Sequence, residues 1–282
     1  MKGKASAPGA LTVINAISTL KGSAFAIDLR TTAEVELDPG RDEVRGEIEG
    51  KPDEDTEMIE RCVELVLDRF DVDAGGEVRT SGEIPMASGL KSSSAAANAA
   101  VLATLEAIDE EMDRREATLI GVQASRDAGV TVTGALDDAS SSMLGGVVVT
   151  DNSEDEVLHH EEFERYCAVY IPDESVRSVD TDVDRSKTIS PVIEEVFEIA
   201  MDGRYARAMT INGLAYCAAL DFDTGPVIEA LEHCEGASLS GTGPSYGAIG
   251  TEEEVESVLD EWEDLPGETM KLRTDNTGGR KE

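Results

Sequence analysis

The segment IPMASGLKSSSAAAN, residues 84–98, constrains the fold of this chain more than any other part of the sequence. A glycine-containing loop leads here into a predicted helix over 92–108, which begins with three serines and continues mainly with alanine. The first N–H groups of a helix lack helical partners, and the helix dipole adds about half a positive charge, so this end attracts phosphate. Taken alone, the segment also fits a core helix with an ordinary N-capping serine.

The lysine in this loop suggests a Walker A motif, because Lys91-Ser92 follows a glycine-bearing turn. That motif, G-x-x-x-x-G-K-[ST], needs glycine directly before the lysine and a second glycine five positions earlier. Neither position is a glycine here, and Leu90 stands directly before the lysine. The loop is therefore not a P-loop, although serine hydroxyls and a lysine beside a free helix end still suit phosphate and Mg²⁺.

The hydrophobic pattern predicts strands and helices that interleave without strict alternation, which favours an α+β fold over a doubly wound sheet. Alternating and β-branched residues predict strands at 24–37, 77–84, 146–150 and 166–172. Apolar residues at helical spacing predict helices at 56–70, 114–128, 190–201, 204–220, 224–234 and 252–261. The other segments are expected to be an acidic loop at 38–55, a glycine-punctuated turn at 129–146, an acidic segment at 151–164, a Gly/Ser-rich turn at 239–250 and a frayed C-terminal tail.

The charge balance excludes one class of function. The chain carries 24 Lys and Arg against 60 Asp and Glu, a formal net charge of −36, so long contacts with nucleic acid are not expected. Lysine accounts for only 8 of the basic residues, and this skew with an acidic surface is typical of proteins that work in concentrated salt. We expect a halophilic source, in which the acidity is an adaptation to solvent and carries no information about the substrate.

The four cysteines are widely spaced and the three histidines form no ligand pattern, so neither a zinc site nor a disulfide framework is expected. The N-terminus lacks an apolar stretch before a cleavage site, and no window approaches the ~20 apolar residues of a membrane span. We therefore expect a cytoplasmic protein without membrane contacts.

Three motifs in order along the chain resemble those of the GHMP kinases, the superfamily of galactokinase, homoserine kinase and mevalonate kinase. The central motif P-x-x-x-G-L-G-S-S-A-A is followed at 85–95, with Lys91 at the place of its last glycine. A-P-G stands at 7–9, and LSGTGPSYG at 239–247 resembles the loop that closes on the active site. The resemblance implies a two-lobed α+β fold, with an ATP-binding lobe like ribosomal protein S5 at 1–160 and a ferredoxin-like lobe at 161–282.

Within the superfamily, the runs GLKSSSAAANA, APGALTVINAI and TGALDDA resemble the archaeal shikimate kinases. This resemblance implies ATP-dependent phosphorylation of shikimate to shikimate 3-phosphate, with Mg²⁺ bridging the phosphates. ATP and shikimate are then the expected binding partners. A second copy of the chain, forming a homodimer, is a further candidate partner. Two alternatives stay open: another small-molecule kinase such as homoserine kinase, and a nucleotide-binding protein that has lost its chemistry.

The resemblance also implies which residues bind ATP. Those of the central motif and of the C-terminal glycine loop are Pro85, Met86, Ala87, Ser88, Gly89, Leu90, Lys91, Ser92, Ser93, Ser94, Ala95, Gly241 and Gly243. The expected Mg²⁺ ligands are Ser93 and Ser94, with Asp127 as a third candidate.

The expected catalytic residues are Asp137 and Lys91. A carboxylate on a glycine-positioned turn can accept the proton of a hydroxyl that attacks the γ-phosphate, and the run from Gly134 to Asp137 matches the G-x-x-D of galactokinase-like enzymes. Asp138 is the alternative base, and a third possibility is that the aspartate only caps the next helix.

One departure from the superfamily concerns a cation. Galactokinase and mevalonate kinase carry Arg or Lys directly after A-P-G, where this chain has Ala10. The candidates to supply that charge are Lys4, Lys21 and Lys91, and the candidates to bind a substrate carboxylate are Arg177, Arg185 and Lys187.

Overall fold

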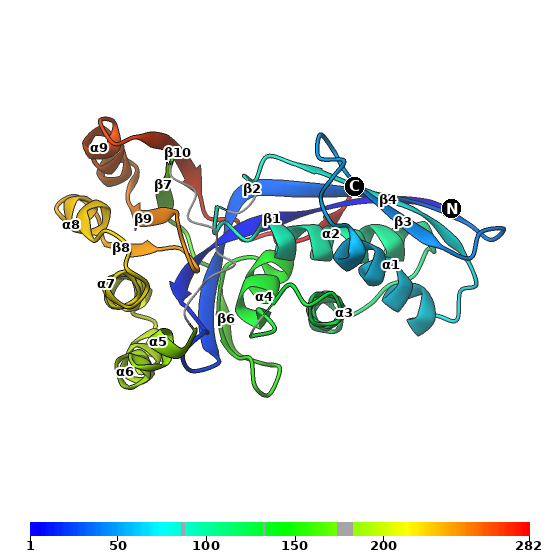
Figure 1. The fold of residues 1–282 in the computed structure, drawn as a ribbon, viewed down its shortest axis with the longest axis horizontal. Helices are drawn as coiled ribbons and strands as arrows, with labels where there is room; N and C mark the ends of the chain where they lie inside the picture. Colours follow the sequence, from blue (N-terminus) through cyan, green and yellow to red (C-terminus); the bar gives the residue numbers. More distant parts are fainter. Residues whose placement is uncertain (86–87, 132, 174–182) are drawn as a thin grey trace.

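The computed structural model describes residues 1–85, 88–131, 133–173 and 183–282 (Figure 1). Across these residues the chain forms a seven-stranded and a four-stranded β-sheet, and helices pack against both. The architecture confirms the predicted α+β class. Every helix within the described ranges is too short or too polar to cross a lipid bilayer.

The first sheet is built on two long antiparallel strands, β1 (Lys2–Ile14) and β2 (Lys21–Asp38). Its order is β11-β1-β2-β4-β3, and β5 and β6 extend it from the first residues of β2. The shorter strands are β3 (Val44–Ile48), β4 (Gly75–Gly82), β5 (Val147–Asp151), β6 (Glu156–Glu161) and β11 (Arg280–Lys281).

Four helices cover one face of this sheet: α1 (Glu57–Arg69), α2 (Ser92–Ala107), α3 (Arg114–Asp127) and α4 (Leu136–Leu144) (Figure 1). Helix α2 is buried along most of its length, because it lies between the sheet and the other helices. Its alanines permit a very close approach: a Cβ on Gly3 of β1 would lie 2.1 Å from the Ala103 carbonyl oxygen. The small residues therefore let α2 pack tightly against the sheet.

The second sheet has the order β10-β7-β9-β8. Its strands are β7 (Tyr166–Pro172), β8 (Gly236–Leu239), β9 (Tyr246–Gly250) and β10 (Gly267–Arg273), and its helices are α5 (Val183–Lys187), α6 (Ser190–Met201), α7 (Tyr205–Leu220), α8 (Gly225–Leu231) and α9 (Glu252–Trp262). One apolar cluster contains Leu11 and Phe25 of the first sheet together with Leu239 and Tyr246 of the second. A shared core thus joins the two sheets.

Three predictions of irregular structure were wrong. The expected turn at 129–146 contains α4, whose consecutive serines are weak helix formers but are held by burial on almost every side. The acidic loop at 38–55 contains β3, which pairs in parallel with β4, and the acidic segment at 151–164 contains β6. The division of the chain at 160/161 stays a prediction. Strand β11, at the end of the chain, belongs to the first sheet and not to the second.

The C-terminal tail is ordered and not frayed as expected. Its Asp275 pairs with Arg30 of β2 at 2.6 Å, and the two side chains are 10% and 15% exposed. The Arg30 guanidinium also donates to the carbonyl oxygens of Gly278 and Ser6 at 2.7 and 3.1 Å. The tail is therefore held against β1 and β2. Its short polar residues predicted disorder, because the partners that order them lie far away in the sequence.

Replacing Arg30 with alanine should lower the free energy of unfolding by about 3 kcal/mol, because it strands a largely buried carboxylate. Chemical denaturation measures the change. Arg41→Ala is the matched control, since its partner Glu77 is exposed and such pairs contribute little. Equal effects of the two variants would contradict the role assigned to Asp275.

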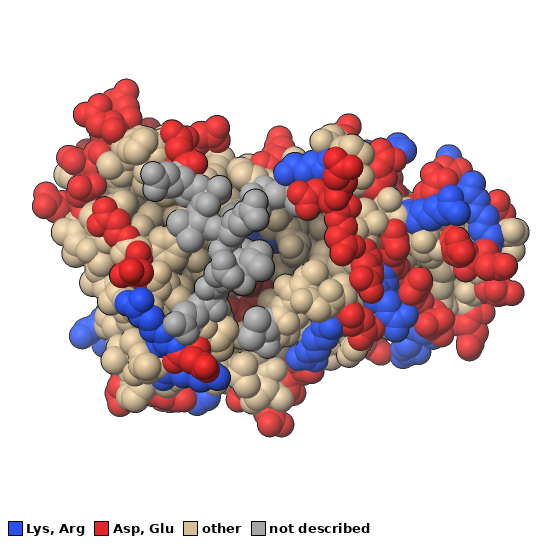
Figure 2. Space-filling view, in the orientation of Figure 1, with Lys and Arg blue, Asp and Glu red and all other residues tan. Residues whose placement is uncertain are grey.

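Acidic side chains outnumber basic ones on the face of the molecule shown in Figure 2. Most of the basic side chains form exposed ion pairs with them, as Lys2 does with Glu36 and Arg79 with Glu47. The net charge of −36 still leaves a large excess of negative charge, whose self-repulsion concentrated salt screens. Assays of this protein therefore belong in molar KCl.

Candidate active site

The start of helix α2 presents unpaired backbone N–H groups. Lys91 precedes the helix in a left-handed conformation, with φ at 64°, and no described side chain caps this end. Ser92, Ser93 and Ser94 form the first turn. The N-capping-serine interpretation is therefore wrong, and the end keeps the donors and the positive dipole that attract an anion.

A second glycine loop, between β8 and β9, lies against the loop that precedes α2. The Ser240 hydroxyl donates to the Gly89 carbonyl oxygen at 2.9 Å, and the Ser245 hydroxyl donates to the carbonyl oxygen of Ser88. Gly89 has φ at 82°, and a Cβ there would lie 2.6 Å from the Ser240 carbonyl oxygen. Glycine is required at this contact, which brings two motifs about 150 residues apart together.

The end of strand β1 and the residue after it also contact the glycine loop between β8 and β9. The Thr12 hydroxyl oxygen accepts from the Gly241 N–H at 2.9 Å, and the Asn15 amide donates to the Gly241 carbonyl oxygen at 2.8 Å. Gly241 and Gly243 have φ at 59° and 81°. The conformation of this loop is thus fixed by β1 and by the loop before α2.

These segments enclose a pocket of about 470 Å³. Its lining includes the start of α2, the glycine loop at 241–243, Thr12 of β1 with Asn15 just after that strand, and both aspartates of α4. A second pocket of about 450 Å³ adjoins it and shares Ser92, Ser93 and Val130. Apolar side chains contribute to that second lining, among them Ile48, Met58, Ile59 and Ile84. Together they offer a polar compartment beside a more apolar one.

Asp137 lies in the first turn of α4 and is 4% exposed. Its Oδ1 accepts from the Asn152 amide nitrogen at 2.9 Å. Burial, and next the Asp138 carboxylate, raise the pKa of Asp137 to about 7, while the Asn152 hydrogen bond and Lys91 act in the opposite direction. Ala135 precedes α4 and no described side chain caps this helix, so the structure gives no support to a purely capping role.

Asp138 has a different partner. Its Oδ2 lies 3.2 Å from Lys91 Nζ, and the two side chains are 15% and 12% exposed. Its Oδ1 is buried without a hydrogen-bond partner among the described residues. Of the three candidate cations at 4, 21 and 91, only Lys91 lines the pocket.

The other predicted residues are distributed as follows. Pro85 lines the adjoining pocket, while Ser88, Leu90 and Ala95 are buried and support the loop. Asp127 is not in the lining; it pairs with Arg61 at 2.7 Å and accepts from Gln123 at 2.5 Å. No cluster of three or more His, Cys, Asp or Glu in the described part of the chain is suited to a metal ion.

The remaining candidate cations lie elsewhere. Lys21 pairs with Glu194 at 3.0 Å. Arg185 and Lys187 lie in α5, where Lys187 pairs with Asp184 at 3.1 Å and Arg185 Nη2 lies 3.8 Å from Asp221. Met86, Ala87 and Arg177 are outside the described residues.

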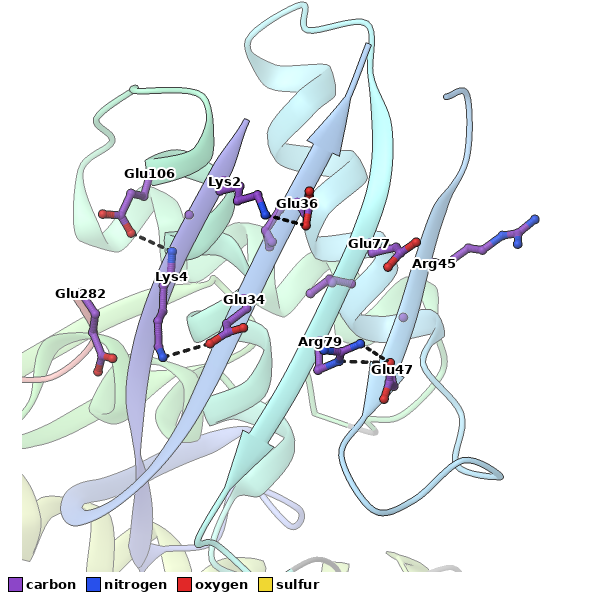
Figure 3. A pocket seen from close by; sticks show the side chains of 14 residues that line it. Lys2, Lys4, Glu34, Glu36, Arg45, Glu47, Glu77, Arg79, Glu106 and Glu282 are labelled. Carbon is purple, nitrogen blue, oxygen red and sulfur yellow. Dashed lines mark hydrogen bonds and ion pairs between the residues drawn. The ribbon is translucent and has the colours of Figure 1, made fainter. Parts of the chain in front are cut away.

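Another hollow, of about 550 Å³, is on the face of the first sheet opposite the helices. Figure 3 shows Lys4, Glu34, Arg79 and Glu47 projecting from it as ion pairs between neighbouring strands. Lys2, Lys4 and Arg79 are each paired with a carboxylate from the next strand, and Arg45 pairs with Glu43 just before its own strand. The charges are therefore already paired. We interpret this surface as a solvated sheet face.

Sequence reasoning missed Thr12, Asn15, Gly22 and Asn152 as site residues. Thr12 and Asn15 follow the A-P-G motif and could have been found from their position beside it. Gly22 and Asn152 carry no local signal, because they meet Asp137 only through the pairing of β2 with β5.

Residues 57–146 match the family model described as "GHMP kinases N terminal domain". The chain is 52% identical to the shikimate kinase of Halobacterium salinarum over 99% of both chains. It is 53% identical to the shikimate kinase of Methanothrix thermoacetophila, covering 99% of this chain and 96% of that one.

Two solved structures are similar in fold. Homoserine kinase from Cytophaga hutchinsonii superposes with a TM-score of 0.75 at 17% identity, covering 100% of this chain and 97% of that one. Mevalonate diphosphate decarboxylase from Staphylococcus aureus gives 0.77 at 15% identity, covering 100% and 98%. At such identities the likeness concerns the fold alone.

Proposed function

The chain belongs to the archaeal shikimate kinases of the GHMP kinase superfamily, and we propose that it transfers the γ-phosphate of ATP to a hydroxyl of shikimate, giving shikimate 3-phosphate and ADP. Full-length identity of about 50% to shikimate kinases carries the choice of substrate. The local geometry supports the reaction type, since one pocket combines a free helix end, a lysine and a buried carboxylate.

The residues present suit ATP and Mg²⁺. The uncapped N–H groups of α2 and the Lys91 ammonium would bind the phosphates, and the adjoining, more apolar pocket would hold the base and ribose. Mg²⁺ commonly takes one or two protein ligands and completes its shell with phosphate oxygens and water. The Ser93 and Ser94 hydroxyls fit that requirement, and Asp127, which is held by Arg61 outside the pocket, does not. Bound Mg²⁺ would neutralise charge on the phosphates.

In this proposal the protein mainly positions and neutralises charge. The loop at 241–243, held by Thr12 and Asn15, lines the pocket beside Lys91. Lys91 stabilises negative charge on the transferred group. Asp137 accepts the proton of the attacking hydroxyl, and its raised pKa makes it a stronger base than an exposed aspartate.

A substrate panel tests this function. With ATP and Mg²⁺ in molar KCl, we expect ADP release with shikimate at a rate at least about a hundredfold above that with homoserine or mevalonate. Coupled ADP detection and mass spectrometry of the product give the measurement. Turnover of homoserine without shikimate would select the rival kinase, and ATP binding without turnover of any acceptor would select a non-catalytic protein.

A further inference from the structure

We propose that Asn152 is a positioning residue for the proton-accepting carboxylate, and that Thr150 and Gly22 complete its setting. The inference rests on the proposed role of Asp137. It assigns functions to three residues that no sequence motif identifies.

The first observation is the direction of the hydrogen bonds. The Thr150 hydroxyl donates to Asn152 Oδ1 at 2.7 Å, and Asn152 Nδ2 donates to Asp137 Oδ1 at 2.9 Å. An ionised carboxylate only accepts hydrogen bonds, so it requires the amide nitrogen on its side, and this leaves the amide oxygen to accept from the Thr150 hydroxyl, whose other acceptor is the Gly22 carbonyl oxygen at 3.4 Å. The amide N–H therefore faces the carboxylate, and the chain of donors favours the ionised form of Asp137.

The second observation is the rigidity of the support. Thr150 lies in β5 opposite Gly22 of β2, and Asn152 follows that strand with its own N–H donating to the Leu20 carbonyl oxygen at 2.7 Å. Thr150 and Asn152 are 0% and 4% exposed. The amide is thus carried by the paired strands β2 and β5, while the carboxylate is carried by α4.

The third observation is the space left by a glycine. A Cβ on Gly22 would lie 2.5 Å from Asp137 Cγ and 2.6 Å from its Oδ2. Only a residue without a side chain lets β2 approach the carboxylate this closely. Asn152 bonds Oδ1, and no described side chain donates to Oδ2, so we assign Oδ2 as the oxygen that receives the proton of the acceptor hydroxyl.

The charged groups that face Asp137 are few. Asp138 of the same helix disfavours its ionised form, and Lys91 at the start of α2 favours it. The Tyr216 phenol of α7 also interacts with its charge. Galactokinase and mevalonate kinase carry a positively charged side chain directly after A-P-G, where this chain has Ala10. In this structure the neutral amide of Asn152 contacts the Asp137 carboxylate directly.

The test is the pH profile of kcat, measured under saturating ATP and shikimate. Removing the amide donor in Asn152→Leu should raise the pKa of Asp137, moving the acidic limb up by about one pH unit. At pH values below the limb, kcat of the variant should be about tenfold lower than that of the unsubstituted protein, while the KM for ATP should change less than about twofold. Thr150→Val, which removes the hydroxyl but keeps the volume, should shift the limb in the same direction, and Thr150→Ser should restore it.

Controls separate positioning from general damage. Asn276→Leu removes an asparagine that accepts from the Phe163 N–H at 2.8 Å and lies at the end of α4 opposite to the turn with Asp137; it should lower the melting temperature without moving the limb. In an Asp137→Asn background, Asn152→Leu should cause no further loss of kcat. If Asn152→Leu does not fold, the Thr150 pair gives the same readout.

Two results would overturn the inference: an unshifted acidic limb in Asn152→Leu or Thr150→Val, or a further loss of kcat when Asn152→Leu is added to Asp137→Asn. Failure of the proposed function gives a different signature, because the unsubstituted protein would then not phosphorylate shikimate. Failure of the role of Asp137 alone would leave Asp137→Asn active.

Discussion

Asp137→Asn should lower kcat by about a thousandfold and leave the dissociation constant for ATP within about twofold of the original. The substitution keeps the shape of the side chain but removes its capacity to accept the hydroxyl proton. ATP binding is expected to persist because the phosphates are assigned to Lys91 and the uncapped start of α2, which the substitution leaves unchanged. Single-turnover kinetics and isothermal titration with ATP measure the two quantities.

Asp138→Asn decides between the two candidate bases. It removes the partner of Lys91 and also the negative charge that raises the pKa of Asp137, so it should change ATP binding or kcat by no more than about tenfold and move the acidic limb to lower pH. Near-normal kcat in Asp137→Asn, together with a thousandfold loss in Asp138→Asn, would transfer the catalytic role to Asp138.

Lys91→Met should raise the KM for ATP by about a hundredfold and lower kcat by about tenfold. Two effects combine here: the phosphates lose a cation at the start of α2, and the pKa of Asp137 rises further because Lys91 no longer favours its ionised form. A methionine retains most of the length and bulk of the lysine stem. Steady-state kinetics over a range of pH separate the two contributions.

Lys4→Met is the matched control for this variant. Lys4 pairs with Glu34 on the open face of the first sheet, away from the pocket lining (Figure 3). Its loss should leave both kinetic constants within about twofold. A similar increase in the KM for ATP in Lys4→Met and Lys91→Met would show that overall charge, and not the position of Lys91, controls nucleotide binding.

The sequence predicted the parts of the site whose structure is local. The glycine-containing loop and the three serines indicated the free start of α2, which follows Lys91 in a left-handed conformation. The glycines at 241 and 243 have positive φ angles in the structure. These features depend on near neighbours, so motif spacing carries them.

The parts that sequence reasoning missed depend on distant partners. The serines of α4 have weak helix propensity, and their burial against other elements outweighs it. The polar tail is ordered by Arg30, which is 245 residues away from Asp275. Asn152 reaches Asp137 only because β5 pairs with β2, and no pattern within residues 151–164 indicates that contact.

Asp127 is a residue that the sequence suggested as a metal ligand and that the fold places outside the pocket. It stands ten residues before Asp137, which made a shared site plausible. Its position at the end of α3 instead directs it to Arg61 of α1. Distance along the chain did not reveal which face of the helix the carboxylate occupies.

The most direct test of the account is a crystal structure of the protein with shikimate, Mg²⁺ and a non-hydrolysable ATP analogue. We expect the terminal phosphate at the start of α2 beside Lys91, with the shikimate 3-hydroxyl within about 3 Å of Asp137 and roughly in line with the bond to be broken. A nucleotide bound away from α2, or a shikimate hydroxyl that Asp137 cannot reach, would contradict the proposed site.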